Sequence, residues 1–351
     1  MDYERFKEGF QDALKVELAV RGADVELTAR RVDKMNDSYD AITVRPVDSS
    51  IGVNISVEKA FAAYENGTPI PEIAEHFADA VEKGFRESPQ VDLESLSDYE
   101  QMKSKLSMEV VSAEKNAELL ESVPHERMED MAVVYRFVLD QTDSGNGTIL
   151  VTNQLLDQYG ITKEQLRADA MENAPEIRPS EIRGMSEVMS ELAPGMIPEV
   201  APEDEQMFVA TVPDKIHGAG VIAYPNFMED AAQKMGGDFF VLPSSIHEVL
   251  LVKDNGQMTA KELENMVKEV NATQVEPADQ LTDHVYHYDS QNHIFELADK
   301  YEERQREAEH DAPDKDSVLG DLKEKKQEIA KKDPAKDAAT KAATKKHEAS
   351  L

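Results

Sequence analysis

The stretch Asp238–Asp254, DFFVLPSSIHEVLLVKD, places two apolar runs on either side of a short polar segment. Both runs are short and rich in aromatic, β-branched and leucine residues, which is typical of buried strands. The segment between them, Pro243–Glu248, carries a proline and two serines, residues that favour turns. The pattern predicts two buried strands joined by a turn, and we name Pro243–Glu248 the PSSIHE segment.

Further elements of a mixed α/β domain surround these strands. Upstream, Met131–Leu139 and Thr148–Asn153 read as paired strands around a glycine-containing loop. ITKEQLRADAMENA reads as a helix with Thr162 as its N-cap, and the proline-rich region 175–205 predicts a long irregular connection. The remaining predicted strands are MFVATV, GVIAY and Val285–Tyr288, and the remaining predicted helices are PNFMEDAAQKMG and Ala260 to about Val270.

The first part of the chain predicts a smaller α-β-β-β-α module. Phe6, Phe10, Leu14 and Leu18 recur at helical spacing, with charged residues on the opposite face. Three strand-like segments follow, and a second helix ends near Phe85. The two helices can cover one face of a small antiparallel sheet. The predicted strands are Val25–Val32, Ala41–Val47 and Ile51–Val57.

These elements predict an α+β, or mixed α/β, chain in five parts. The small module occupies residues 1–87, and an acidic linker occupies residues 88–100. The larger mixed α/β domain covers residues 101–290 and is followed by a helical extension over residues 291–312. Residues 313–351 form a Lys/Ala-rich, low-complexity sequence with little to bury, which predicts a disordered tail.

The formal net charge of −33 is the strongest compositional signal. Residues 303–351 hold 12 basic and 12 acidic residues, so residues 1–302 carry the whole net charge. A chain of this kind repels nucleic acid and anionic membranes and attracts basic partners. The same charge also serves solubility alone, and both interpretations stay open.

Composition also bears on the compartment. The chain contains no cysteine, which excludes disulfides and thiolate metal sites and fits a reducing compartment. No apolar run approaches the roughly 20 residues of a membrane helix, and the polar start lacks the apolar core of a signal peptide. We therefore expect a cytoplasmic protein.

Segments spread over most of residues 1–290 match one family pattern. They include MDYERFKEGF, VDKMNDSYDAITVRP, ILVTNQLLDQYGITKEQLRADAMEN, LTDHVYHYD and, as the most specific, GDFFVLPSSIHEVLLV. Together they resemble an uncharacterised bacterial family, domain of unknown function 5688, found mostly in gut Firmicutes. The sequence departs from the family pattern over Val53–Val57. The resemblance implies an intracellular protein of unknown activity and assigns no catalytic residue.

The PSSIHE segment holds the first candidate site. His247 and Glu248 begin a His-Glu-x-x-His motif, but Leu251 stands where the second histidine belongs. Ser244 and Ser245 lack the flanking glycines of a Gly-x-Ser-x-Gly elbow. A structural turn is one interpretation, because Ser245 and Glu248 have capping-box spacing.

The other interpretation of the PSSIHE segment is a catalytic site. His247 would be a general base, and Glu248 would be its orienter or a metal ligand. Ser244 or Ser245 would be a polar contact or the nucleophile. Loops beside rigid strands often carry such sites, so both interpretations stay open.

A second candidate site lies in DHVYHYD, Asp283–Asp289. If this stretch is a strand, His287 and Asp289 share a face and, joined by His247, form a candidate zinc or manganese site. The alternative is an edge strand with aromatic residues on one face. Two sequence motifs for phosphate-containing cofactors do not fit. GAGVIA, Gly218–Ala223, loosely matches a dinucleotide-binding fingerprint, but a strand-like segment stands where that fingerprint needs the start of a helix. No phosphate-binding Gly-x-x-x-x-Gly-Lys-Ser/Thr loop is present, so the cofactor stays unknown.

Together these signals predict a two-domain protein that works by binding. Its expected partners are proteins, basic ones among them, and the folded body is expected to contact neither membrane nor nucleic acid directly. One alternative is a hydrolase-like or metal-dependent enzyme with its site at Ser244–Glu248. Another is an acidic nucleic-acid mimic linked to mobile elements. Whether the protein is an enzyme and what its oligomeric state is stay open.

Overall fold

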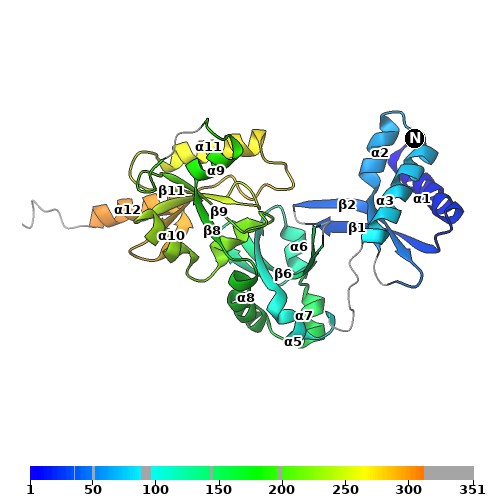
Figure 1. The fold of residues 1–351 in the computed structure, drawn as a ribbon, viewed down its shortest axis with the longest axis horizontal. Coiled ribbons are helices and arrows are strands. Elements are labelled where there is room, and N and C mark those ends of the chain that lie inside the picture. The colour runs from blue at the N-terminus through cyan, green and yellow to red at the C-terminus, as the bar shows by residue number, and fades with distance from the viewer. Residues whose placement is uncertain (35, 50–51, 88–95, 143–144, 197–199, 312–351) are drawn as a thin grey trace, which may run out of the picture. The chain divides into compact units, whose positions relative to one another are not determined.

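The computed structural model describes residues 1–34, 36–49, 52–87, 96–142, 145–196 and 200–311. The chain divides into two units, Met1–Ala298 and Asp299–Leu351. The first unit contains three antiparallel sheets together with helices, which confirms the mixed α+β prediction (Figure 1). Within the described ranges, every helix is too short or too polar to cross a membrane. The predicted tail, residues 313–351, lies outside the described residues.

A three-stranded antiparallel sheet with order β1-β2-β3 forms near the N-terminus. Helix α1 begins after Asp2, whose carboxylate accepts a hydrogen bond from the Arg5 backbone N–H. The predicted apolar face of α1 is buried in one core with α3 and the sheet. Helix α2 was not predicted; it starts after Ser56, whose side chain caps it. The elements are α1 (Tyr3–Val20), β1 (Val25–Lys34), β2 (Asp37–Pro46), β3 (Val53–Ser56), α2 (Val57–Glu65) and α3 (Ile70–Glu87).

A four-stranded sheet follows, and strand β6 is its centre. Strand β4 pairs with β6 along one edge, while β5 and β7 pair with it along the other. The predicted hairpin of β6 and β7 is confirmed, whereas β4 was missed because buried polar residues such as Glu109 interrupt its apolar pattern. The elements are α5 (Tyr99–Met102), η1 (Lys103–Lys105), β4 (Leu106–Ser112), α6 (Ala117–Ser122), β5 (His125–Met128), β6 (Met131–Thr142), β7 (Gly145–Leu150), α7 (Asn153–Tyr159) and α8 (Lys163–Ile177).

The third sheet has six antiparallel strands in the order β13-β12-β10-β11-β9-β8. The two apolar runs around the PSSIHE segment are β10 and β11, in the middle of this sheet, as buried strands. The elements are β8 (Glu181–Gly184), α9 (Met185–Leu192), β9 (Met207–Thr211), η2 (Gly218–Ala223), α10 (Phe227–Met235), β10 (Phe239–Leu242), β11 (Val249–Lys253), α11 (Ala260–Thr273), β12 (Tyr286–Asp289), β13 (Ile294–Leu297) and α12 (Ala298–Asp311).

Three predictions for this region differ from the structure. The region 175–205 contains strand β8 and helix α9 and is not wholly irregular. Residues 294–297, predicted within a helical extension, form β13 because they pair with β12. GVIAY is not a strand: most of it lies in the 3-10 helix η2, where the Ala219 N–H donates to the Ile246 carbonyl of the PSSIHE segment.

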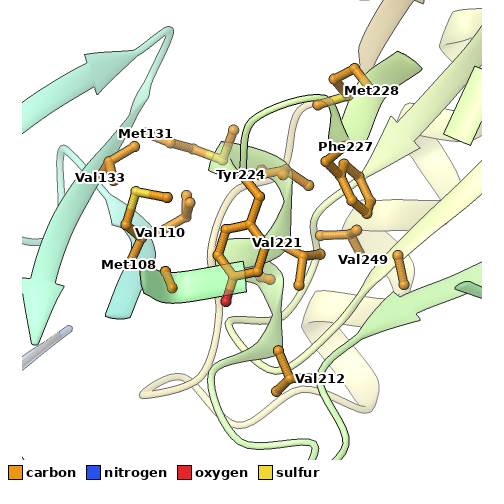
Figure 2. Close-up of a cluster of buried hydrophobic side chains, with 14 of the residues drawn as sticks. Met108, Val110, Met131, Val133, Val212, Val221, Tyr224, Phe227, Met228 and Val249 are labelled. Atoms are coloured by element: carbon orange, nitrogen blue, oxygen red, sulfur yellow. The ribbon is translucent and has the colours of Figure 1, made fainter. Parts of the chain in front are cut away.

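Helix η2 joins the four-stranded and six-stranded sheets into one core. Figure 2 shows Met108 and Val110 of β4 facing Val221 and Tyr224, with Val249 of β11 beyond them. The two backbones approach so closely that a Cβ on Gly220 would lie 2.3 Å from the Met108 carbonyl oxygen. Only glycine therefore fits at this contact without moving η2 or β4.

The Gly220→Ala substitution is expected to lower the free energy of unfolding by about 1–3 kcal/mol, because the added methyl group overlaps backbone atoms of β4. Urea denaturation followed by circular dichroism measures this change. Gly9→Ala is the control, since its added Cβ would lie 3.7 Å from Ile70 Cδ1 in ordinary contact. Because Gly9 lies inside helix α1, Gly9→Ala is expected to raise the free energy of unfolding by about 0.5–1 kcal/mol. Equal stability of Gly220→Ala and wild type would contradict the close packing.

Candidate functional site

The PSSIHE segment is tied by its backbone to the segment 279–284. Ser245 forms an antiparallel bridge with Gln280. The Ile246 N–H donates to the Asp279 carbonyl at 2.8 Å, and the Leu281 N–H donates to the Ser244 carbonyl at 3.1 Å. These bonds make the PSSIHE segment a support for the chain that follows α11.

The side chains of the PSSIHE segment differ in their surroundings. Ser245 is buried, and its Oγ accepts a hydrogen bond from the His247 N–H at 3.0 Å. This local turn replaces the predicted capping box between Ser245 and Glu248. Within the described part of the chain, the half-buried side chains of Ser244 and Glu248 take part in no hydrogen bond or ion pair. Glu248 therefore does not orient His247 here.

Both ring nitrogens of His247 have neighbours. Its Nδ1 accepts a hydrogen bond from the His217 backbone N–H at 3.2 Å, so the Nδ1 lone pair is engaged. In the neutral ring the proton then resides on Nε2, which lies 3.5 Å from Asp279 Oδ1. A general base needs an accessible lone pair on one ring nitrogen. The geometry thus favours a structural role for the imidazole.

A polar network centred on a buried carboxylate lies beside this histidine. Glu109 of β4 is almost fully buried; its Oε1 lies 2.8 Å from His217 Nδ1, and its Oε2 accepts from Arg136 Nε at 2.6 Å. Burial raises the pKa of the Glu109 carboxyl, but the hydrogen bond from His217 and the charge of Arg136 outweigh it and hold the pKa below its ordinary value. Sequence reasoning missed these three residues, because β4, β6 and the turn before η2 meet only in the fold.

The two predicted metal ligands lie on β12. His287 is fully buried, its Nε2 is 3.0 Å from Asp254 Oδ2, and its ring packs edge-on against Phe240. Asp289 accepts hydrogen bonds from the backbone N–H groups that begin the turn after β12. The neighbours of His247 are His217 and Asp279. Across the described ranges, no three His, Asp or Glu side chains are grouped so that they could hold a metal ion.

The segment 279–284 also forms one wall of a pocket of about 210 Å³, which we name the acidic pocket. Buried Asn271 of α11 donates from Nδ2 to the Thr282 carbonyl at 2.9 Å and to Asp283 Oδ1 at 2.7 Å. Its Oδ1 is buried without a hydrogen-bond partner. The pocket is lined by Ser112, Glu114, Lys115, Asp130, Asn271, Gln280, Leu281, Thr282, Asp283 and His284.

Sequence reasoning did not find the acidic pocket. Its walls come from the end of β4, the turn between β5 and β6, helix α11 and the segment 279–284. Asp130 sits inside this assembly because its Oδ2 accepts a hydrogen bond from Thr282 Oγ1 at 2.6 Å and its Oδ1 accepts from the Tyr286 hydroxyl. These partners are more than 150 positions apart in the sequence, so no local motif signals them.

The Ser245→Ala substitution is expected to lower the free energy of unfolding by about 1–3 kcal/mol, because it leaves the His247 N–H without its acceptor. Ser244→Ala is the matched control, because the Ser244 side chain makes no such bond, and its effect is expected to stay within about 0.5 kcal/mol. Urea denaturation of both variants gives the comparison. Equal losses in the two would contradict a structural role specific to Ser245.

The Glu109→Gln substitution is expected to lower the free energy of unfolding by about 3–5 kcal/mol at neutral pH, because it removes the buried carboxylate that pairs with the half-buried guanidinium of Arg136. A carboxyl whose pKa is lowered by folding stabilises the protein above its ordinary pKa of 4.5, and this contribution disappears as the pH falls through the lowered value. The gap between variant and wild type should therefore narrow below pH 4.5.

Urea denaturation at a series of pH values measures that gap. The exposed residue Glu118 of α6 supplies a control, since Glu118→Gln removes one carboxylate without breaking a buried pair. The difference between Glu118→Gln and wild type should stay within about 0.5 kcal/mol. A Glu109→Gln gap that stays constant through the acidic range would show that the Glu109 charge contributes nothing to stability.

Comparison with known proteins gives one match. The model of a family described as a family of unknown function, DUF5688, matches residues 3–290. Searches of the curated proteins and of the solved structures found no match. The matched region includes all three sheets except β13, together with the PSSIHE segment and the acidic pocket. The chain therefore belongs to the DUF5688 family of unknown function.

Proposed function

We propose that the protein works by binding a basic protein partner. The observation that carries this proposal is the charge balance: residues 1–302 hold 59 acidic and 26 basic residues. Ion pairs inside the fold, such as Arg136 with Glu109, use equal numbers of each sign and leave the excess of acid unchanged. Excess negative charge attracts cationic partners and accelerates their association.

The hydrogen bonding of the PSSIHE segment supports binding over catalysis. The candidate nucleophile Ser245 accepts from the His247 N–H, so its oxygen is turned toward the backbone of its own segment. The candidate base His247 uses Nδ1 to accept from the His217 N–H. Both groups thus serve the fold, and the hydrolase alternative has no further observation in its favour.

The proposal predicts charge-selective and salt-dependent binding. A fluorescent ten-residue peptide of alternating arginine and serine should bind the full chain, and the matching glutamate and serine peptide should not. The Debye length falls from about 30 Å at 0.01 M salt to about 10 Å at 0.1 M, so Kd should rise about tenfold over that range. Fluorescence anisotropy measures both effects. Equal binding of the two peptides, or no binding of the basic one, would contradict the proposal.

A further inference from the structure

We propose that the acidic pocket is the site at which the protein holds one cationic side chain, arginine or lysine, of its partner. The inference rests on the proposed function and names the anchor of that interaction. Three observations carry it: a buried acceptor without a donor, three carboxylates outside any ion pair, and a volume that fits a single side chain. No residue of the predicted catalytic or metal sites lines this pocket.

The buried acceptor is Oδ1 of Asn271. This residue is only 6% exposed, and its Oδ1 has no hydrogen-bond partner in the described structure. Flipping the amide does not help, since Nδ2 already donates to the Thr282 carbonyl and to Asp283 Oδ1, which both require a donor. Leaving a buried acceptor unpaired has a cost in stability. An N–H group from a ligand in the pocket would remove this cost.

The pocket carries an excess of negative charge. The carboxylates of Glu114, Asp130 and Asp283 line it, and none of them forms an ion pair within the described residues. The Lys115 ammonium, which also lines the pocket, donates to the Gln280 side-chain oxygen at 3.0 Å. A cation entering the pocket therefore meets carboxylates that no side chain of the fold already neutralises, and charged hydrogen bonds are the stronger kind.

The volume of the pocket fits one amino-acid side chain better than a larger ligand. Pockets for drug-sized ligands measure about 300–1,000 Å³. At about 210 Å³ this one is smaller, which suits one extended side chain with its polar end at Asn271. Arginine is enriched where single residues dominate protein interfaces, and its guanidinium carries five donors for carbonyl and carboxylate acceptors. Lysine offers three donors and the same charge.

The wall of the pocket is preorganised. The Leu281 N–H donates to the Ser244 carbonyl, and Ser245 is bridged to Gln280, so the PSSIHE segment holds this wall from behind. Asn271 of α11 also holds this wall, because its Nδ2 donates to the Thr282 carbonyl and to Asp283 Oδ1. A rigid site avoids the ordering cost that a flexible one incurs on binding. The PSSIHE segment thus supports the wall of the pocket.

The test compares two pairs of substitutions in the full chain. Glu114→Gln with Asp283→Asn removes two pocket charges while keeping the shape and an acceptor for Asn271. Glu203→Gln with Asp204→Asn removes two charges from exposed side chains elsewhere, so the net charge changes equally. All four substituted side chains are exposed, so both variants are expected to fold. The probe is the arginine and serine peptide, measured by fluorescence anisotropy.

The pocket variant is expected to weaken peptide binding about tenfold, and the control variant less than twofold. In wild type, the side-chain amide signals of Asn271 should shift in NMR spectra as the peptide is added, and free agmatine should compete with the peptide. Equal weakening by both variants, with no shift at Asn271, would overturn the pocket while leaving charge-driven binding intact. Absence of peptide binding to wild type would instead remove the proposed function itself.

Discussion

The close contact between η2 and β4 is the constraint on which the larger core depends. Gly220 lies against the Met108 carbonyl, and only the absence of a side chain lets the two backbones meet. Through this contact the apolar side chains of the four-stranded and six-stranded sheets form one continuous cluster. Packing at interior density leaves no room for an added methyl group. The same contact brings His217 close to Glu109, because His217 directly precedes η2 and Glu109 lies on β4.

The PSSIHE segment holds two neighbouring parts of the fold through its backbone. Its backbone bonds to the segment 279–284, and a neighbouring residue of η2, Ala219, donates to its Ile246 carbonyl. The segment therefore links the edge of η2 to the wall of the acidic pocket. A polar turn between two central strands is costly to bury unless its groups are hydrogen-bonded, and here its own residues and two other segments supply the partners.

The charged side chains discussed above form two groups, those with a partner of opposite charge and those without one. In the network of Arg136, Glu109 and His217, a buried carboxylate is paired with two half-buried partners, and the lowered pKa of Glu109 reflects that pairing. The carboxylates of the acidic pocket are more exposed and have no cationic partner among the described residues. Paired charges of the first kind serve the fold, whereas unpaired charges beside an unsatisfied acceptor are available to a ligand.

The amino-acid sequence by itself determined the elements with strong local signals. The apolar spacing of α1, the strand-like segments of β1 and β2 and the apolar runs of β10 and β11 follow from local patterns, which need no distant contact. The N-cap of α8 at Thr162 is equally local. The excess of acid in residues 1–302 is also a property of the sequence alone.

Only the tertiary structure decided the rest. GVIAY has a strand-like composition, but Gly220 packs against β4, and the N–H groups of Gly220 and Tyr224 donate to carbonyls three residues back, so the stretch forms most of η2. The burial of Glu109 in strand β4 could not be predicted from periodicity, because its partners Arg136 and His217 lie in distant parts of the sequence. The acidic pocket combines Asp130, Asn271 and Asp283 in the same way. Local sequence reports local propensity, whereas a site depends on which distant segments the core brings together.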